Sequence, residues 1–140
     1  MKNLLLCLCL AVICNVSAQS LSVKFTNIRN NNGVFRVGFF INETSYKEGN
    51  PKYYKTVSKQ QVVNGEMIYT FNDIQPGVYG IVVLDDENAN DKTDYFLFFP
   101  KEGLGLSNYP ITKIQIPKFK DFEFSFQNTD VLVTIQLKYL

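Results

Sequence analysis

The sequence predicts an all-β fold: a single antiparallel β-sandwich of the immunoglobulin-like or transthyretin-like kind, with about seven strands and Greek-key connections. Three observations support this prediction. Short segments of alternating apolar and polar residues recur along the 140-residue chain. Turn signals built from Asn, Gly and Pro separate them roughly every 8 to 12 residues, as in a sandwich. No segment shows the period of an amphipathic helix, and no repeat or linker divides the chain.

The first residues predict a signal peptide over 1–18 and export of the remainder. Lys2 precedes an apolar run over 4–13, and Val16-Ser17-Ala18 supplies the small residues of a cleavage site. The run is too short to span a bilayer, which takes roughly 20 residues. We therefore expect cleavage after Ala18, a β-sandwich domain over 19–140 without a transmembrane segment, and a periplasmic or extracellular location.

All three cysteines, Cys7, Cys9 and Cys14, lie in the segment to be removed. Lipid attachment at Cys14 is disfavoured because the large residue Ile13 precedes it. The mature chain is therefore expected to lack disulfides, although its compartment would permit them. The chain has no histidine and no tryptophan, and the mature part has no cysteine, which argues against a catalytic triad and a zinc enzyme.

Charge narrows the class of partner. Removal of Lys2 with the leader leaves 13 basic and 13 acidic side chains, with no basic stripe among them. Recognition of phosphates needs clustered positive charge, so we expect no nucleic acid partner.

The expected strands follow the alternation, and the most apolar of them, over 78–84, is expected to be central. Strands are expected over 21–25, 34–41, 52–63, 67–71, 78–84, 95–99, 111–116, 122–126 and 131–140. Polar loops are expected over 42–51, 85–94 and 101–110. Gly103 and Gly105 in the last of these favour a compact Ω-shaped turn; the alternative is a polar patch of Glu102, Ser107 and Asn108 beside the acidic loop.

Three turn signals set the expected connections. The Asn-rich turn over 30–33 is expected to join the first two strands into a hairpin. Asn64-Gly65 fits a type I′ turn, whose two central residues have positive φ. Pro76-Gly77 fits a turn in which Pro presets the first φ and Gly accepts a positive second one.

The segment 85–94 holds five of the 13 acidic residues and has the rhythm of a calcium-binding loop. Asp86, Asn88 and Asn90 fall at loop positions one, three and five. Lys92 falls at position seven, where a backbone carbonyl serves, and Asp94 falls at position nine. Calcium prefers such carboxylate, amide and carbonyl oxygens, so these five residues are the candidate metal ligands.

Departures from the loop pattern predict weak calcium affinity, in the range of roughly 0.1 to 1 mM. Asp91 stands where glycine is preferred, and Leu97 stands where a bidentate glutamate is usual. Glu102 in the next loop is a candidate for the missing carboxylate. The alternative is a plain acidic turn between two strands, and both interpretations stay open.

Two runs of sequence resemble a bacterial family of secreted proteins, the domain-of-unknown-function family 2141. They are the Pro-Gly-x-Tyr strand with its Asp/Asn loop over 76–90, and the Pro-Lys-Glu-Gly-Leu-Gly-Leu-Ser-Asn run over 100–108. The resemblance implies an exported β-sandwich with no established activity. The chain departs from the family pattern at Ala89 and Asp91, where glycine is usual, and at Asp85, where a histidine is often found.

These observations favour an exported, non-catalytic module that binds a protein or glycan, with loops stiffened by calcium. One alternative is a secreted hydrolase that uses a carboxylate pair, Asp86 or Asp94 with Glu102. A second alternative is a carrier of a small apolar ligand, in which the 12 Phe and eight Tyr residues line a pocket instead of filling a core.

Overall fold

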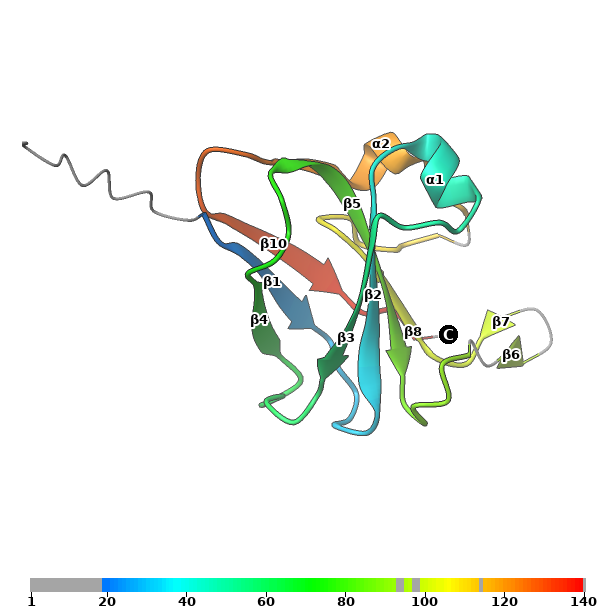
Figure 1. The fold of residues 1–140 in the computed structure, drawn as a ribbon. Coiled ribbons are helices and arrows are strands. Elements are labelled where there is room, and N and C mark those ends of the chain that lie inside the picture. Colours follow the sequence, from blue (N-terminus) through cyan, green and yellow to red (C-terminus); the bar gives the residue numbers. More distant parts are fainter. Residues whose placement is uncertain (1–18, 93–94, 97–98, 114, 140) are drawn as a thin grey trace, which may run out of the picture.

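The computed structural model describes residues 19–92, 95–96, 99–113 and 115–139, and it forms the all-β sandwich that the sequence predicts. Figure 1 shows the two sheets facing each other, with two short helices at one end. The smaller sheet has the order β10 (Val131–Gln136), β1 (Leu21–Thr26), β4 (Met67–Phe71). The larger sheet has the order β3 (Tyr53–Ser58), β2 (Val34–Phe40), β5 (Gly77–Asp86), β8 (Gly103–Leu106), and β9 (Glu123–Phe126) also pairs with β5. A small hairpin joins β6 (Tyr95–Phe96) to β7 (Phe99–Pro100).

Alternation along the strands builds the core between the sheets. Leu21, Val23 and Phe25 of β1 are fully buried, and the residues between them are partly exposed. Phe25 stacks on Phe35 of β2 with ring centroids 4.6 Å apart, which ties one sheet to the other. These aromatic residues pack between the two sheets and fill the core.

The first two strands do not form the expected hairpin. β1 and β2 lie in different sheets, and β1 pairs with β4 on one side and with β10 on the other. The pairing of β1 with β10 is parallel, an exception to the otherwise antiparallel ladders. The segment 27–33 crosses between the sheets, and the amide of Ile28 donates to the carbonyl of Gly65 at 3.0 Å. Alternation predicted both strands, but it carries no information about partners.

The Asn64-Gly65 turn has the predicted positive φ at both residues, 51° and 75°. It closes only a bridge between Val63 and Glu66, because β3 and β4 continue into different sheets. Gly77 has no positive φ and begins β5, so the predicted Pro-Gly turn geometry is wrong. The strand over 78–84 is central, as predicted, and extends to Asp86.

Several expected loops contain structure. The loop over 42–51 contains α1 (Glu43–Lys47), which begins with a capping box between Asn42 and Ser45. The expected Ω-turn contains β8, where a Cβ on Gly105 would lie 2.5 Å from the Ile135 side chain, so glycine permits this close strand approach. No strand forms over the described residues 111–113 and 115–116.

The second helix, α2 (Phe119–Phe122), precedes β9 and is too short to show a helical period. Phe119 and Phe122 pack with Phe40 and Leu106 in a second apolar cluster, against which Tyr46 of α1 also packs. The two helices therefore cover one end of the larger sheet on its outer face (Figure 1).

Within the described ranges, no helix is long and apolar enough to cross a membrane. The expected leader over 1–18 and its cleavage site after Ala18 lie outside the described residues.

Gly33 and Gly49 offer a matched test of the fold, because both have positive φ (70° and 64°). A Cβ on Gly33 would lie 1.9 Å from the carbonyl oxygen of Asp86, whereas a Cβ on Gly49 would meet nothing within 4 Å. We expect Gly49→Ala to cost about 1–2 kcal/mol of unfolding free energy. Gly33→Ala is expected to cost at least ~2 kcal/mol more, because backbone must move. Urea denaturation measures both, and equal losses would contradict the close contact of 27–33 with β5.

Candidate functional site

The end of β5 is the most polar buried part of the described chain. Asp85 and Asp86 are its last two residues, and both have 0% of their surface exposed. The expectation that they belong to a solvated loop is therefore wrong. Because successive strand residues point to opposite faces, Asp85 faces the space between the sheets and Asp86 faces the outer side of the larger sheet.

Asp85 forms an ion pair inside the sandwich. Its Oδ1 accepts a hydrogen bond from Nζ of Lys59 at 2.5 Å, and Lys59 is also fully buried. Its Oδ2 accepts a hydrogen bond from the hydroxyl of Tyr139 at 2.6 Å. The Lys59 ammonium lies 5.3 Å from the ring centroid of Phe35 and 3.4 Å from Oδ1 of Asn30. Lysine is rarely buried completely, and here the Asp85 carboxylate balances the charge of the buried Lys59 ammonium.

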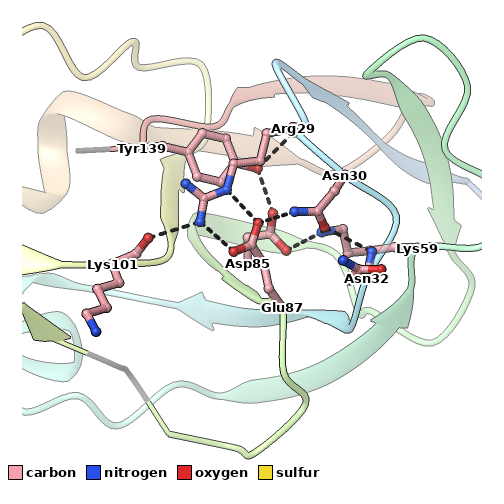
Figure 2. Close-up of polar contacts among 8 residues, drawn as sticks. All are labelled: Arg29, Asn30, Asn32, Lys59, Asp85, Glu87, Lys101 and Tyr139. Carbon is pink, nitrogen blue, oxygen red and sulfur yellow. Dashed lines mark hydrogen bonds and ion pairs between the residues drawn. The ribbon is translucent and has the colours of Figure 1, made fainter.

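A second layer of polar contacts surrounds this pair (Figure 2). The Arg29 guanidinium stacks over the Tyr139 ring at 4.4 Å and binds both carboxylate oxygens of Glu87 at 2.6 and 2.5 Å. The Asn30 side-chain amide also donates to Glu87, at 2.6 Å. The Lys59–Asp85–Tyr139 group is thus held by residues from the crossing segment 27–33 and from the C-terminal end.

The environment shifts the pKa values of these groups. Burial raises the pKa of Asp85, and it outweighs the hydrogen bonds from Lys59 and Tyr139 that act in the other direction. Burial and the bond to Asp85 also raise the pKa of the Tyr139 hydroxyl. The hydrogen bond from Arg29 lowers the pKa of Glu87 below its usual range. Glu87 therefore stays ionised more readily than Asp85.

Asp86 belongs to a different network on the outer face. Its Oδ2 accepts from Nε of Arg36 at 2.9 Å, and Arg36 also donates to Oγ1 of Thr56 at 3.0 Å. The Arg36 guanidinium lies 3.4 Å from Oδ1 of Asp91, which accepts a hydrogen bond from the Tyr54 hydroxyl at 3.2 Å. Burial raises the pKa of Asp86, but the bonds from Arg36 and from backbone amides outweigh it, so the pKa is lowered.

Four of the five candidate calcium ligands lie in one turn. The Asn90 amide donates to Asp86 Oδ1 and to Asn88 Oδ1, at 3.1 Å each. The Lys92 amide donates to Asn90 Oδ1 at 2.9 Å. Asp94 lies outside the described residues. Among the described residues, no three His, Cys, Asp or Glu side chains converge as they would around a metal ion.

The Asp86 carboxylate is already occupied in this turn, because the Asp91 amide donates to Oδ2 at 3.0 Å beside Arg36. Ala89 and Asp91 adopt positive φ of 53° and 59°. Arg36 thus supplies a positive charge where the sequence pattern suggested a calcium ion. Calcium binding stays a prediction, and Arg36 would compete with it.

Of the three carboxylates in the hydrolase alternative, Asp86 and Glu102 lie among the described residues and Asp94 does not. Asp86 is bound by Arg36, and Glu102 is buried next to β8. The partners that organise the site, Lys59 and Arg36, were missed because each is an ordinary lysine or arginine in the sequence. Their only signal is position: Lys59 directly follows β3, and Arg36 interrupts the apolar run of β2.

Arg36 also lines a groove of about 460 Å³ on the outer face of the larger sheet. The remaining lining residues are mainly apolar or small: Gly38, Phe40, Gly49, Pro51, Tyr54, Val82 and Leu84. A larger hollow of about 710 Å³ lies at the helical end, where Lys47, Lys118, Lys120, Glu43 and Glu123 contribute to its lining. The first groove adjoins the Asp86–Arg36 network, and the second contains neither aspartate.

The family comparison matches residues 23–134 to a family model described as uncharacterized protein conserved in bacteria, DUF2141. The match covers most of the chain, including both runs that carry the resemblance. No curated protein and no solved structure matches the chain.

Removal of the Lys59 charge leaves Asp85 buried without its cation. We expect Lys59→Met to cost roughly 3–5 kcal/mol of unfolding free energy, as for other broken buried pairs. Adding Asp85→Asn is expected to restore part of that loss, because it removes the charge and keeps an acceptor for Tyr139. Chemical denaturation of the two variants decides the point: a double variant less stable than Lys59→Met would contradict the buried pair.

The lowered pKa of Asp86 makes part of the stability depend on pH. Below the ordinary value of 3.8, the unfolded chain takes up this proton before the folded chain does. Stability is therefore present above that value and is lost as the pH falls through the folded pKa. We expect Asp86→Asn to flatten this acid dependence in melting curves recorded between about pH 2 and 5. An unchanged slope would contradict the Arg36 contact.

Calcium titration separates the two interpretations of the turn. If the ion binds at Asp86, it competes with Arg36, so Arg36→Gln is expected to bind calcium more tightly than the unmodified chain. Calorimetry measures both affinities, with Asp86→Asn as the control. Absence of binding in both at millimolar calcium would establish a plain acidic turn.

Proposed function

The chain belongs to this bacterial family, and we propose that it is an exported, non-catalytic module that binds a glycan in the groove on the outer face of the larger sheet. The observation that carries the proposal is the groove itself, an apolar depression with one fixed charged group at its border. Small-molecule sites typically combine an apolar lining with a few well-placed polar groups.

Tyr54 supports a sugar ligand. It has 56% of its surface exposed although it lies on a strand, and it lines the groove. Its hydroxyl is held by Asp91, so the ring is fixed at the groove border. An exposed aromatic ring offers a flat apolar surface and a polar tip, which suits a sugar ring with its apolar faces and hydroxyl edges.

Arg36 supports the same ligand class. Only 16% of its side chain is exposed, and Asp86, Thr56 and Asp91 fix its position. A charged group held in this way loses little conformational entropy when it binds a ligand hydroxyl or carboxylate. Gly38 keeps the floor of the groove low between Phe40 and Pro51.

The non-catalytic assignment and export are parts of the same proposal. The carboxylates near the groove serve structural contacts, and Asp86 is neutralised by Arg36. Retaining glycosidases need two carboxyl groups about 5–5.5 Å apart across the bond to be cleaved. Export is supported by the apolar run over 4–13 and the small residues before position 19.

Screening on an array of defined oligosaccharides tests the proposal, followed by calorimetry with the best ligand. We expect Tyr54→Ala to lower the affinity at least tenfold, since stacking and a fixed ring are lost. Tyr69→Ala is the matched control, because Tyr69 is 38% exposed on β4 of the other sheet. Equal effects of the two variants, or no ligand on the array, would overturn the glycan site.

A further inference from the structure

We propose that Lys59 and Asp85 become joined by an amide bond that forms within the folded chain. Both side chains are completely buried, because each has 0% of its surface accessible. The Lys59 Nζ lies 2.5 Å from Asp85 Oδ1. The carboxyl carbon, one bond further, then lies within reach of a near-attack separation, roughly 3–3.5 Å.

The fold holds the two groups together on either side of β2. Phe35 of β2 pairs with Val57 of β3 on one side and with Asp85 of β5 on the other. Lys59 follows the end of β3, and its ammonium reaches over the Phe35 ring toward Asp85. Three neighbouring strands therefore fix the approach, and the reactants need no further ordering.

Burial favours the neutral carboxylic acid form of Asp85. A dry interior penalises an ammonium and a carboxylate more than an amine and a carboxylic acid. The charged groups that face the pair, Arg29 and Glu87, are bound to each other by two hydrogen bonds. Exclusion of water also protects the product, because hydrolysis of the amide needs a water molecule at the same place.

The condensation balances without any further reactant. The Lys59 ammonium passes one proton to Asp85 Oδ1, and the resulting amine attacks the carboxyl carbon. The negative charge of the tetrahedral intermediate develops on Oδ2, where the Tyr139 hydroxyl already donates at 2.6 Å. A second proton moves from nitrogen to Oδ1, the carbon–Oδ1 bond breaks, and Oδ1 leaves as water. An amide between Nζ and the carboxyl carbon remains.

Other lysine–carboxylate pairs of the described chain lack this setting. Lys24–Glu66, Lys47–Glu43 and Lys55–Asp73 have 28 to 70% of each side chain exposed. Water solvates these charges, and no dry interior drives their condensation, so they stay ion pairs. Lys55–Asp73 is therefore an internal control within the same protein.

The bond would supply a covalent constraint that the sequence otherwise lacks. Cysteine occurs only at positions 7, 9 and 14, so the domain over 19–140 has none for a disulfide. A link between Lys59 and Asp85 closes a loop across a separation of 26 residues. Like a disulfide, it would restrict the unfolded chain and so raise the free energy of unfolding.

Intact mass spectrometry under denaturing conditions tests the proposal on the full chain as purified. The N-terminus is read in the same experiment, so that the calculated mass refers to the chain present. We expect a mass lower than calculated by one water molecule, and a digest containing one branched peptide that joins Lys59 to Asp85. An ion pair does not survive these conditions, so the full calculated mass with unlinked peptides from folded protein would overturn the proposal.

Two variants locate the bond. Lys59→Arg is expected to show its full calculated mass, whereas the control Lys55→Arg keeps the loss of one water. A water loss that persists in Lys59→Arg would place the modification elsewhere and overturn the assignment. If Lys59→Arg fails to fold, the presence or absence of the branched peptide in the chain without substitutions still decides the question.

Discussion

The contact between Lys59 and Asp85 is the interaction on which the rest of the structure depends. Two charged side chains lie where the sandwich should be apolar, and their removal from water is costly unless each finds partners. The required partners, Tyr139 and Asn30, come from the C-terminal end and from the crossing between the sheets. Segments distant in sequence are therefore brought to one point by the need to satisfy one buried pair.

The alternation of a single strand separates two roles. Asp85 braces the interior, and Asp86, one residue later, anchors Arg36 on the outer face. The same strand thus fixes both the core and the border of the proposed glycan groove. The segment 27–33 packs on the end of β5, where Gly33 meets the Asp86 backbone. This contact fixes the Asp85 side in the core relative to the Asp86 side on the outer face.

The sequence was sufficient for the fold class and for most strands, because alternation reports directly which residues face a core. It did not predict strand partners, and so the parallel pair of β1 with β10 replaced the expected hairpin. It also did not separate Asp85 and Asp86 from the acidic loop, since the two strand-end carboxylates look like loop residues until their cations are placed. Lys59 and Arg36 act over 26 and 50 positions, distances at which local patterns carry no signal.

The burial of the Lys59 side chain is the central claim, and nuclear magnetic resonance of the lysine side chains tests it most directly. In a chain labelled with nitrogen-15 at lysine, one Nζ is predicted to have protons protected from exchange and close to the Phe35 ring. That signal should disappear in Lys59→Arg. If every lysine Nζ exchanges as freely as a solvated ammonium, Lys59 lies in water and the buried contact with Asp85 is contradicted.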